Sequence, residues 1–410
     1  MRLPTVLLAA ATFATLTAAE GLSVSFLPQD LPKKVATCKA LNRASQEVKD
    51  IGIDYVEVNP NAERTVLMVH GWPSLWHSWK YQIEEFKTLI SLEYSLHITH
   101  ILAKHSYCGL SCVTLWNIVG ADDYRLIVPD LRGFGPSGHP GDVKSSGTIP
   151  DIVGDLTCVL AHAGVSNVVC MGHDWGTSVC FQLARQRPDL ALAVLGSIIP
   201  YLPNAGPYAP ISALVPVFPE LAYQVFLGET PKAAADELDR DVRRSLRATL
   251  RTVASPPPEG FLTDTHSFLS AYADIAEIPP IPFFTKEEED YWVEQYSIQG
   301  FYHTLQFYTP DNQHGTWAFI DAQGNRTITH PVLAIYPLND PVANWEEAAK
   351  LLHSADYLPN LTTHLIKGAH WAQLENPTAF NGIARPWLEG LPWASKSQEG
   401  VHGGRPADEL

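Results

Sequence analysis

The sequence has 410 residues, 46% of them hydrophobic and 18% charged, so it can bury a full core and does not resemble a disordered acidic protein. Its 28 Lys and Arg residues against 44 Asp and Glu residues give a formal net charge of −16, which argues against nucleic acid as a partner. Beyond the N-terminus no apolar stretch reaches the roughly 18 to 20 residues of a transmembrane helix.

Residues 1–19 have the pattern of a secretory signal peptide. Arg2 is followed by an apolar run over residues 6–16 and by small residues up to Ala19. We expect cleavage after Ala19 and entry into the secretory pathway, with the endoplasmic reticulum lumen or secretion as the destination. A buried N-terminal helix is the alternative interpretation.

The first predicted strands cover residues 55–58 and 65–69, and the second leads into the sequence His-Gly-Trp72-Pro. A predicted helix then ends near Lys87. Residues 88–121 carry only two charges and separate that helix from the next strand, although such connections usually have about 2 to 6 residues. We expect this segment to lie outside the working fold, as a translated intron. The alternative is an amphipathic insert that contacts a membrane, although the segment lacks a basic face.

The next predicted strand, residues 125–128, is followed by Asp-Leu-Arg-Gly-Phe-Gly-Pro-Ser, for which a structural role at the rim of a site is expected. A strand over residues 167–171 then leads into Gly-His-Asp174-Trp175-Gly, with a helical run after it. Glycines two residues before and after Asp174 relieve crowding at a sharp turn between strand and helix. The alternative is a tight turn in which Asp174 caps the helix.

After a strand over residues 191–199, residues 201–320 are rich in proline, aromatic residues and helical periodicity. Helices are expected over residues 231–253 and 286–308. We interpret this stretch as a helical cap inserted between two strands, with its proline-rich pieces as connectors.

The last predicted strands cover residues 332–336 and 362–366. Asp340 follows the first of them and His370 follows the second, 30 residues further along the chain. A turn-forming aspartate and a surface histidine are the alternative readings. The chain ends in Ala-Asp-Glu-Leu, which is similar to the KDEL retrieval signal, and the sequons at Asn325 and Asn360 fit exposure in the secretory pathway.

The six cysteines do not by themselves require disulfides. Cys158, Cys170 and Cys180 lie among apolar neighbours in predicted helices or a strand, where small buried thiols are expected. Cys108 and Cys112 have a CxxxC spacing but no second pair of ligands with the spacing of a zinc site, so no metal is expected.

The alternation of strands and helices predicts an α/β fold with a mainly parallel sheet covered by helices on both faces. We therefore expect the chain to divide into a signal peptide (1–19), a first core segment (20–200) with the insert 88–121, a helical cap (201–320), a second core segment (321–392) and a flexible tail (393–410).

Four of these motifs, in this order, resemble those of the epoxide hydrolases in the α/β-hydrolase superfamily, whose core has an eight-stranded sheet. The resemblance implies that Asp174 is a nucleophile in the position that serine has in many relatives. It implies that His370 is the general base, held by Asp340, and that the backbone N–H groups of Trp72 and Trp175 form the oxyanion hole.

A carboxylate nucleophile that attacks an sp3 carbon forms an alkyl ester, which water must then hydrolyse. When an epoxide opens, its oxygen leaves as an alkoxide and needs acids that donate to it. By resemblance, Tyr223 and Tyr308 are these acids, and a packing role is the alternative for each. The expected substrate is a small apolar epoxide together with water, and no cofactor is implied.

Two other kinds of function are compatible with the sequence: dehalogenation, and binding without catalysis. Haloalkane dehalogenases share the Gly-His-Asp-Trp-Gly turn, but many have Asn where this chain has Trp72. Fluoroacetate dehalogenases are also similar, but they typically carry Arg where this chain has Trp175. A function of another class would be that of a catalytically inactive hydrolase fold used for binding. The identity of the epoxide and the oligomeric state do not follow from the sequence.

Overall fold

The computed structural model describes residues 24–87 and 124–393. The predicted signal peptide, residues 88–121 and the C-terminal residues 394–410 lie outside the described residues. So do Cys108 and Cys112.

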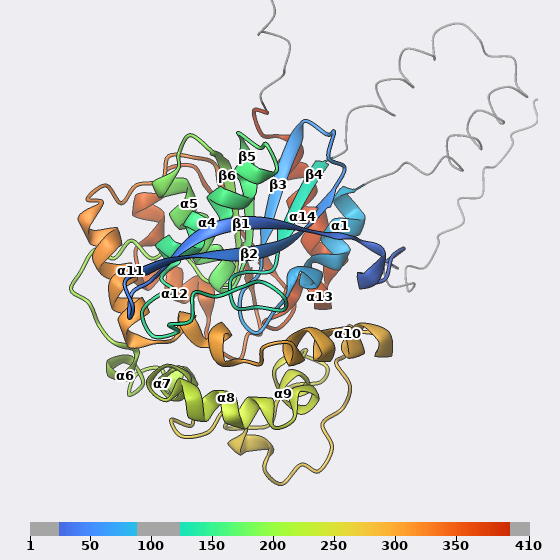
Figure 1. Ribbon diagram of the computed structural model, residues 1–410, viewed down its shortest axis with the longest axis vertical. Coiled ribbons are helices and arrows are strands. Elements are labelled where there is room, and N and C mark those ends of the chain that lie inside the picture. Colours follow the sequence, from blue (N-terminus) through green and yellow to red (C-terminus); the bar gives the residue numbers. More distant parts are fainter. Residues whose placement is uncertain (1–23, 88–123, 394–410) are drawn as a thin grey trace, which may run out of the picture.

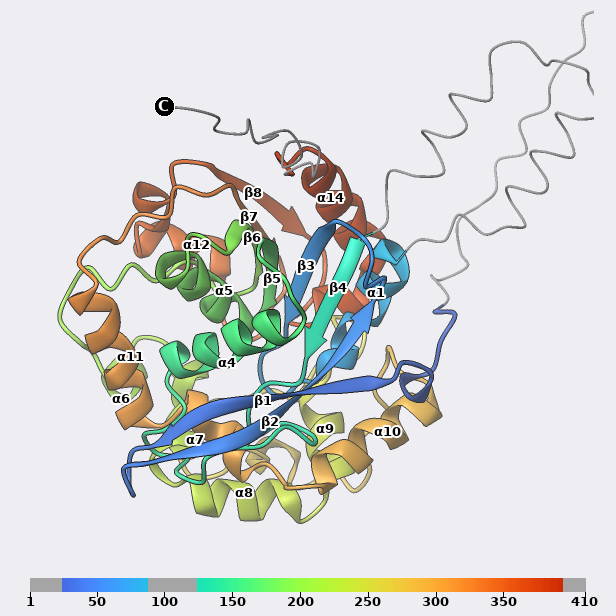
Figure 2. The same cartoon turned by 45° about the horizontal axis from the view of Figure 1, so that its top comes forward.

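Eight strands form one sheet in the order β1-β2-β4-β3-β5-β6-β7-β8 (Figures 1 and 2). From β4 to β8 all neighbouring strands are parallel, whereas β2 is antiparallel to both β1 and β4. The strands are β1 (Lys33–Asn42), β2 (Glu47–Val58), β3 (Arg64–Val69), β4 (Tyr124–Pro129), β5 (Val168–His173), β6 (Ala191–Ser197), β7 (Val332–Pro337) and β8 (Leu361–Ile366).

Helices cover both faces of the sheet, and the strand sequences explain why. In β3, Leu67 and Val69 pack into the core on the side of α4 and α5, while Val66 and Met68 pack into the core on the side of α1 and α14. Successive side chains of a strand point to opposite faces, so a strand buried on both faces is apolar throughout. The four helices are α1 (Lys80–Phe86), α4 (Ile149–His162), α5 (Trp175–Gln186) and α14 (Pro377–Glu389).

A helical cap lies between β6 and β7 in the sequence and sits beyond the carboxyl ends of the parallel strands (Figure 1). Its helices are α6 (Ile211–Leu214), α7 (Ala222–Glu229), α8 (Pro231–Asp239), α9 (Val242–Thr249), α10 (Lys286–Ser297) and α11 (Pro310–Ala322). The remaining α-helices, α12 (Trp345–Leu351) and α13 (Ala372–Glu375), belong to the core. Short 3-10 helices are η1 (Pro28–Asp30), η2 (Trp76–Trp79), η3 (Pro219–Leu221), η4 (Ser270–Tyr272), η5 (Tyr302–Phe307) and η6 (Ser354–Tyr357).

A buried ion pair joins the cap to the core. Thr285 and Glu288 form a capping box at the start of α10, and the Glu288 carboxylate also accepts hydrogen bonds from Lys80 Nζ of α1, at 2.8 Å to each oxygen. Lys80 and Glu288 are both buried, so breaking this contact would leave a charge without its partner inside the protein.

The predicted fold class, an α/β-hydrolase core with an inserted cap, is confirmed. Strand β1 was not predicted, and the predicted helix over residues 231–253 is divided into α8 and α9. The expectation of buried free thiols was wrong, because Cys38 pairs with Cys158 and Cys170 pairs with Cys180 in disulfides. Each pair joins different elements, which the local sequence around a single cysteine cannot reveal.

Within residues 24–87 and 124–393, no helix has the length and apolar character needed to cross a membrane.

Candidate active site

Asp174 lies in the turn between β5 and α5, in a strained backbone conformation with φ 55° and ψ −127°. The residues two positions before and two positions after Asp174 must be glycine for this turn to form. A Cβ atom on Gly172 would lie 2.4 Å from the carbonyl oxygen of Gly176, and one on Gly176 would lie 2.1 Å from that of Val69. The turn therefore holds the Asp174 carboxylate at the carboxyl end of the sheet, beneath the cap.

The loop after β3 supplies a backbone donor to this carboxylate. Trp72 N–H donates to Asp174 Oδ1 at 2.9 Å, and the Trp175 N–H also hydrogen-bonds the carboxylate. Gly71 allows this approach, because a Cβ there would lie 2.3 Å from Asp174 Oδ1. The two N–H groups that were expected to hold an oxyanion therefore both hydrogen-bond the Asp174 carboxylate.

His370 lies between two carboxylates. Its Nδ1 is 2.8 Å from Asp340 Oδ2, and its Nε2 is 3.6 Å from Asp174 Oδ2. The hydrogen bond to Asp340 places a proton on Nδ1 and leaves Nε2 facing Asp174 with its lone pair in the neutral ring. The distance to Asp174 is longer than a hydrogen bond, so the two side chains are adjacent without being bonded.

Two contacts that the sequence did not indicate fix the Asp340 carboxylate. Val342 N–H donates to Oδ1 at 2.9 Å, and the Trp345 indole N–H donates to Oδ2 at 2.6 Å. With His370 as the third donor, the buried Asp340 side chain has a partner on each oxygen. Trp345 follows Asp340 by five residues, but nothing in its local sequence distinguishes it from a packing residue.

Burial and charge shift the pKa values in this group. Burial lowers the pKa of His370, but Asp340, through its charge and hydrogen bond, and the charge of Asp174 outweigh this and raise it above the ordinary value. Burial raises the pKa of Asp174, and His370 together with the Trp72 and Trp175 N–H groups opposes that rise.

Tyr223 and Tyr308 reach this site from the cap. Tyr223 lies on α7, Tyr308 follows η5, and their ring centroids are 5.8 Å apart. Both side chains are buried. Burial and the Asp174 charge raise the pKa of each phenol well above its usual value, so both hydroxyls keep their protons and can donate hydrogen bonds.

Gly228 is a residue of this site that the sequence analysis missed. A Cβ at this position of α7 would lie 2.0 Å from the carbonyl oxygen of Tyr308. The glycine lets α7 pack directly on the chain at Tyr308, which brings Tyr223 beside Tyr308. No helix was predicted over residues 222–229, so a glycine after a short apolar stretch was the only sequence signal, and it is weak.

The loop after β4 supports the site from below. Arg132 is buried and paired with Asp155, and Leu131 N–H donates to His70 Nε2 at 3.1 Å. Gln306, two residues before Tyr308, donates from Nε2 to the Arg132 carbonyl oxygen at 2.7 Å. This loop thus connects the segment that carries Trp72 to the segment that carries Tyr308.

All seven residues predicted for the site are brought together at the carboxyl edge of the sheet and the inner face of the cap. Among the described residues there is no group of three or more His, Cys, Asp or Glu side chains that could hold a metal ion.

Comparison with known proteins places this arrangement in context. The family described as the alpha/beta hydrolase fold matches residues 64–377. Bifunctional epoxide hydrolase 2 of Sus scrofa is 24% identical over 328 residues, which cover 79% of this chain and 51% of that protein. Epoxide hydrolase A of Mycobacterium tuberculosis is 25% identical over 362 residues, which cover 84% of this chain and 96% of that one.

The solved structures agree on the fold. An epoxide hydrolase from an endophytic Streptomyces has a TM-score of 0.67 at 24% identity, covering 88% of this chain and 96% of that chain. Epoxide hydrolase A from Mycobacterium thermoresistibile has a TM-score of 0.64 at 21% identity, covering 88% of this chain and 100% of that chain. The chain spans about half the length of the mammalian relatives that it matches.

Proposed function

The chain belongs to the α/β-hydrolase fold family, and we propose that it hydrolyses an epoxide to a vicinal diol through a covalent ester on Asp174. The observation that carries this proposal is the pair of buried phenols. Tyr223 and Tyr308 stay protonated and lie close enough for the Asp174 charge to raise their pKa values. An oxygen held between these hydroxyls would lie above the nucleophile.

In the first step, Asp174 Oδ2 attacks an epoxide carbon and the bond from that carbon to the ring oxygen breaks. Oδ1 keeps its hydrogen bond from the Trp72 N–H and becomes the carbonyl oxygen of the new ester, with the Trp175 N–H as the second donor to this group. The ring oxygen leaves as an alkoxide, which accepts hydrogen bonds from both Tyr223 and Tyr308 and a proton from one of them, and that tyrosine becomes a phenolate. The expulsion of a poor leaving group is thereby assisted at the atom where negative charge develops.

In the second step, His370 Nε2 takes a proton from water as the water oxygen attacks the ester carbonyl carbon. The resulting oxyanion at Oδ1 is held by the two N–H groups, and the imidazolium is stabilised by Asp340 at 2.8 Å. Collapse of this intermediate breaks the bond between its carbon and the former Oδ2, and the imidazolium returns its proton to that leaving oxygen. The second proton of the water restores the phenol that was deprotonated in the first step, so that the diol is released and the carboxylate is regenerated. The oxygen of this water remains in Asp174, and the two diol oxygens are the epoxide oxygen and the former Oδ2.

Haloalkane dehalogenation is the second candidate, and the contacts of two indoles disfavour it. Trp72 Nε1–H donates to Thr304 Oγ1 at 2.9 Å, and the Trp175 side chain hydrogen-bonds the Tyr308 hydroxyl. A leaving halide would need such N–H donors. Here both are already bonded to hydroxyl groups, whereas the two phenols suit an alkoxide.

Diol release from a panel of aryl, aliphatic and terpenoid epoxides tests the proposal directly. Changing both Tyr223 and Tyr308 to Phe should lower kcat by at least 100-fold, on the order of what positioned general acids contribute. Tyr302→Phe is the matched control, since Tyr302 is a partly exposed tyrosine of the same 3-10 helix that precedes Tyr308.

Two results would contradict the mechanism. One is turnover of haloalkanes at rates comparable to epoxides. The other comes from a single turnover in 18O-labelled water, in which the covalent route puts the label into Asp174 and direct attack of water puts it into the diol. A binding protein without activity would release no diol from any epoxide.

We also propose that the protein works in the secretory pathway, after removal of residues 1–19. The disulfides Cys38–Cys158 and Cys170–Cys180 support an oxidising compartment. Asn325 and Asn360, the acceptor residues of the two sequons, are both exposed. N-terminal sequencing should find Glu20 first, and glycosidase treatment should increase mobility on a gel. A cytosolic protein that keeps Met1 and reduced thiols would refute this assignment.

A further inference from the structure

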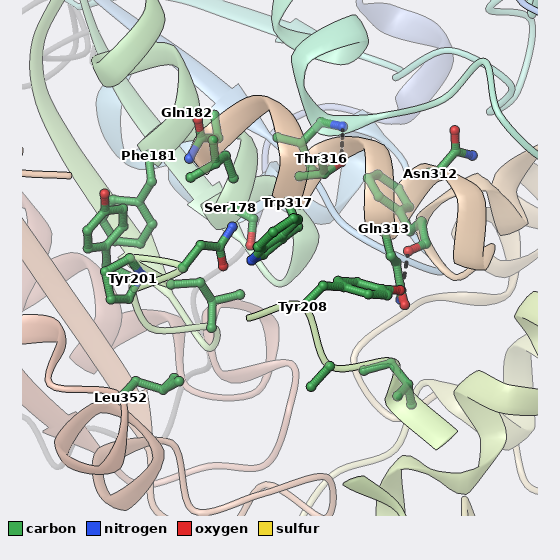
Figure 3. Close-up of a pocket in the computed structure, with 18 of the residues that line it drawn as sticks. Ser178, Phe181, Gln182, Tyr201, Tyr208, Asn312, Gln313, Thr316, Trp317 and Leu352 are labelled. Carbon is green, nitrogen blue, oxygen red and sulfur yellow. Dashed lines mark hydrogen bonds between the residues drawn. The ribbon is translucent and has the colours of Figure 1, made fainter. Parts of the chain in front are cut away.

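A cavity of about 530 Å³ lies beside the nucleophile turn and does not include Asp174, His370 or the two phenols. It is lined by residues of α5, by residues 201–209 and α6, by the cap helix α11 and by the end of α12 (Figure 3). Trp175 and Phe307 both line it, and their rings are stacked at 5.4 Å. Trp175 directly follows Asp174, and Phe307 directly precedes Tyr308. One wall of the cavity is therefore formed by the segments that carry these two site residues.

One stripe of α5 leads away from the nucleophile along this cavity. Trp175, Ser178 and Gln182 all line it, and they are separated by three and four residues, which places them on one face of the helix. With a rise of 1.5 Å per residue, Gln182 lies about 10 Å along the helix axis beyond Trp175. The cavity therefore extends about 10 Å along α5, starting at the residue that follows Asp174.

Most polar groups that line the cavity are bonded within the protein. Tyr201 Oη donates to the Arg326 carbonyl oxygen, Thr316 Oγ1 accepts from Ile149 N–H, and Trp317 Nε1 donates to the Gly206 carbonyl oxygen.

Ser178 Oγ and Gln182 Oε1 differ from these groups, because both atoms are buried and neither has a hydrogen-bond partner in the described part of the chain. Gln182 as a whole is 3% exposed. Tyr208 Oη and Gln306 Oε1 also line the cavity without partners, but they lie on other segments. Gln186 Nε2, one turn further along α5, is likewise buried without a partner, but Gln186 does not line the cavity. An unpaired buried acceptor is unfavourable and is normally satisfied by a water molecule or a ligand.

We propose that this cavity binds the part of the substrate remote from the epoxide, and that this part is an elongated apolar chain with a hydroxyl group about 10 Å from the reacting carbon. The proposal rests on the epoxide hydrolysis proposed above. A hydroxyl group fits both atoms, because it can donate its one proton to Gln182 Oε1 and accept a hydrogen bond from the Ser178 hydroxyl. The aromatic and aliphatic side chains around them would cover the chain.

A set of three substrates tests this assignment: a decane-based terminal epoxide with a hydroxyl at the far end, the same compound without that hydroxyl, and a butane-based epoxide. In the unmodified protein the hydroxyl should raise kcat/KM by about tenfold, as expected for one hydrogen bond to a buried acceptor. Gln182→Leu should remove this preference. Gln186→Leu, the same change one turn further along α5 and outside the cavity, should keep it.

A second variant tests the cavity itself. Ser178→Phe fills it, so the ratio of kcat/KM for the decane-based to the butane-based epoxide should fall by about tenfold. Equal use of the decane-based epoxides with and without the hydroxyl, or the same behaviour of Gln182→Leu and Gln186→Leu, would overturn the proposal and leave epoxide hydrolysis standing.

Failure of the proposed function gives a different result, namely no diol from any epoxide. The cavity can then be judged by the binding of decanediol, measured by isothermal titration calorimetry. Binding that Gln182→Leu weakens by about tenfold and Gln186→Leu does not would support the cavity assignment. No binding by the unmodified protein would refute it.

Discussion

Deleting residues 88–121 should leave a folded, active and more stable protein. The two ends of the described chain at this point already meet, because Asn59 Nδ2 donates to the carbonyl oxygens of both Lys87 (3.0 Å) and Tyr124 (3.1 Å). These oxygens are therefore no more than about 6 Å apart. After the deletion Asp122 and Asp123 would join Lys87 to Tyr124, and three Cα–Cα steps span up to about 11 Å.

The expected gain follows from loop closure. The connection shortens from 36 residues to two, counting from Lys87 to Tyr124. For a flexible loop this shortening lowers the free-energy cost of loop closure by about 2.5 kcal/mol, which favours the folded state. Unfolding in urea, followed by circular dichroism, should show a higher midpoint with an unchanged slope. The kcat/KM for an epoxide should stay within about twofold, because the site residues lie elsewhere.

Two controls sharpen this test. Asn59→Ala in the full chain removes the side chain that holds both ends and should lower stability, whereas Asn61→Ala changes an exposed asparagine of the same turn and should not. A deletion variant that is less stable or inactive would show that residues 88–121 pack against the domain. A transcript that always encodes them would separately refute their origin as a translated intron.

Three further predictions follow from the site and the cap. His370→Gln should accumulate the ester, seen by intact mass spectrometry as protein plus one substrate, and Asp174→Asn should show no adduct. His370 must be neutral to act as a base, and its pKa is raised above 6.5, so activity should fall as the pH drops through that raised pKa. Asp340→Asn should move this acidic limb of the pH–activity profile to lower pH. An acidic limb that does not move would exclude His370 as the titrating group. Lys80→Met should lower the free energy of unfolding in urea by about 3 to 5 kcal/mol, and adding Glu288→Leu should recover part of this loss. If the losses of the two single variants simply add in the double variant, Lys80 and Glu288 are not energetically coupled.

The parts of the fold and site that could be predicted are those that depend on short, contiguous segments of sequence. Asp174, Trp72, Asp340 and His370 each follow a parallel strand, and because the carboxyl ends of parallel strands share one edge of the sheet, strand prediction alone brings them together.

Strand β1 escaped prediction for a physical reason. Its inward positions are Ala36, Cys38 and Ala40, which are small residues with little strand preference, and its outward positions are mostly polar or charged. Its pairing with β2 and its packing on α4 stabilise it as a strand. Such contacts involve residues far away in the sequence.

The contacts that position the catalytic groups were likewise beyond prediction. Trp345 on Asp340, Thr304 on the Trp72 indole and Gly228 against Tyr308 all depend on how distant segments meet. The pairing of Cys38 with Cys158 joins residues 120 positions apart, and a sequence does not specify which cysteines pair.

The Cys170–Cys180 disulfide has a consequence for how the protein can be produced and studied. It joins β5 to α5 on the two sides of Asp174, so the strand and the helix cannot separate while the bond is intact. Amide hydrogens of this turn should therefore exchange with solvent only through larger openings of the domain, even when the cap moves. Protein made in a reducing cytoplasm would lack this constraint. A preparation with free thiols and one with both disulfides would then have the same sequence but differ in how long Asp174 stays in this position during handling.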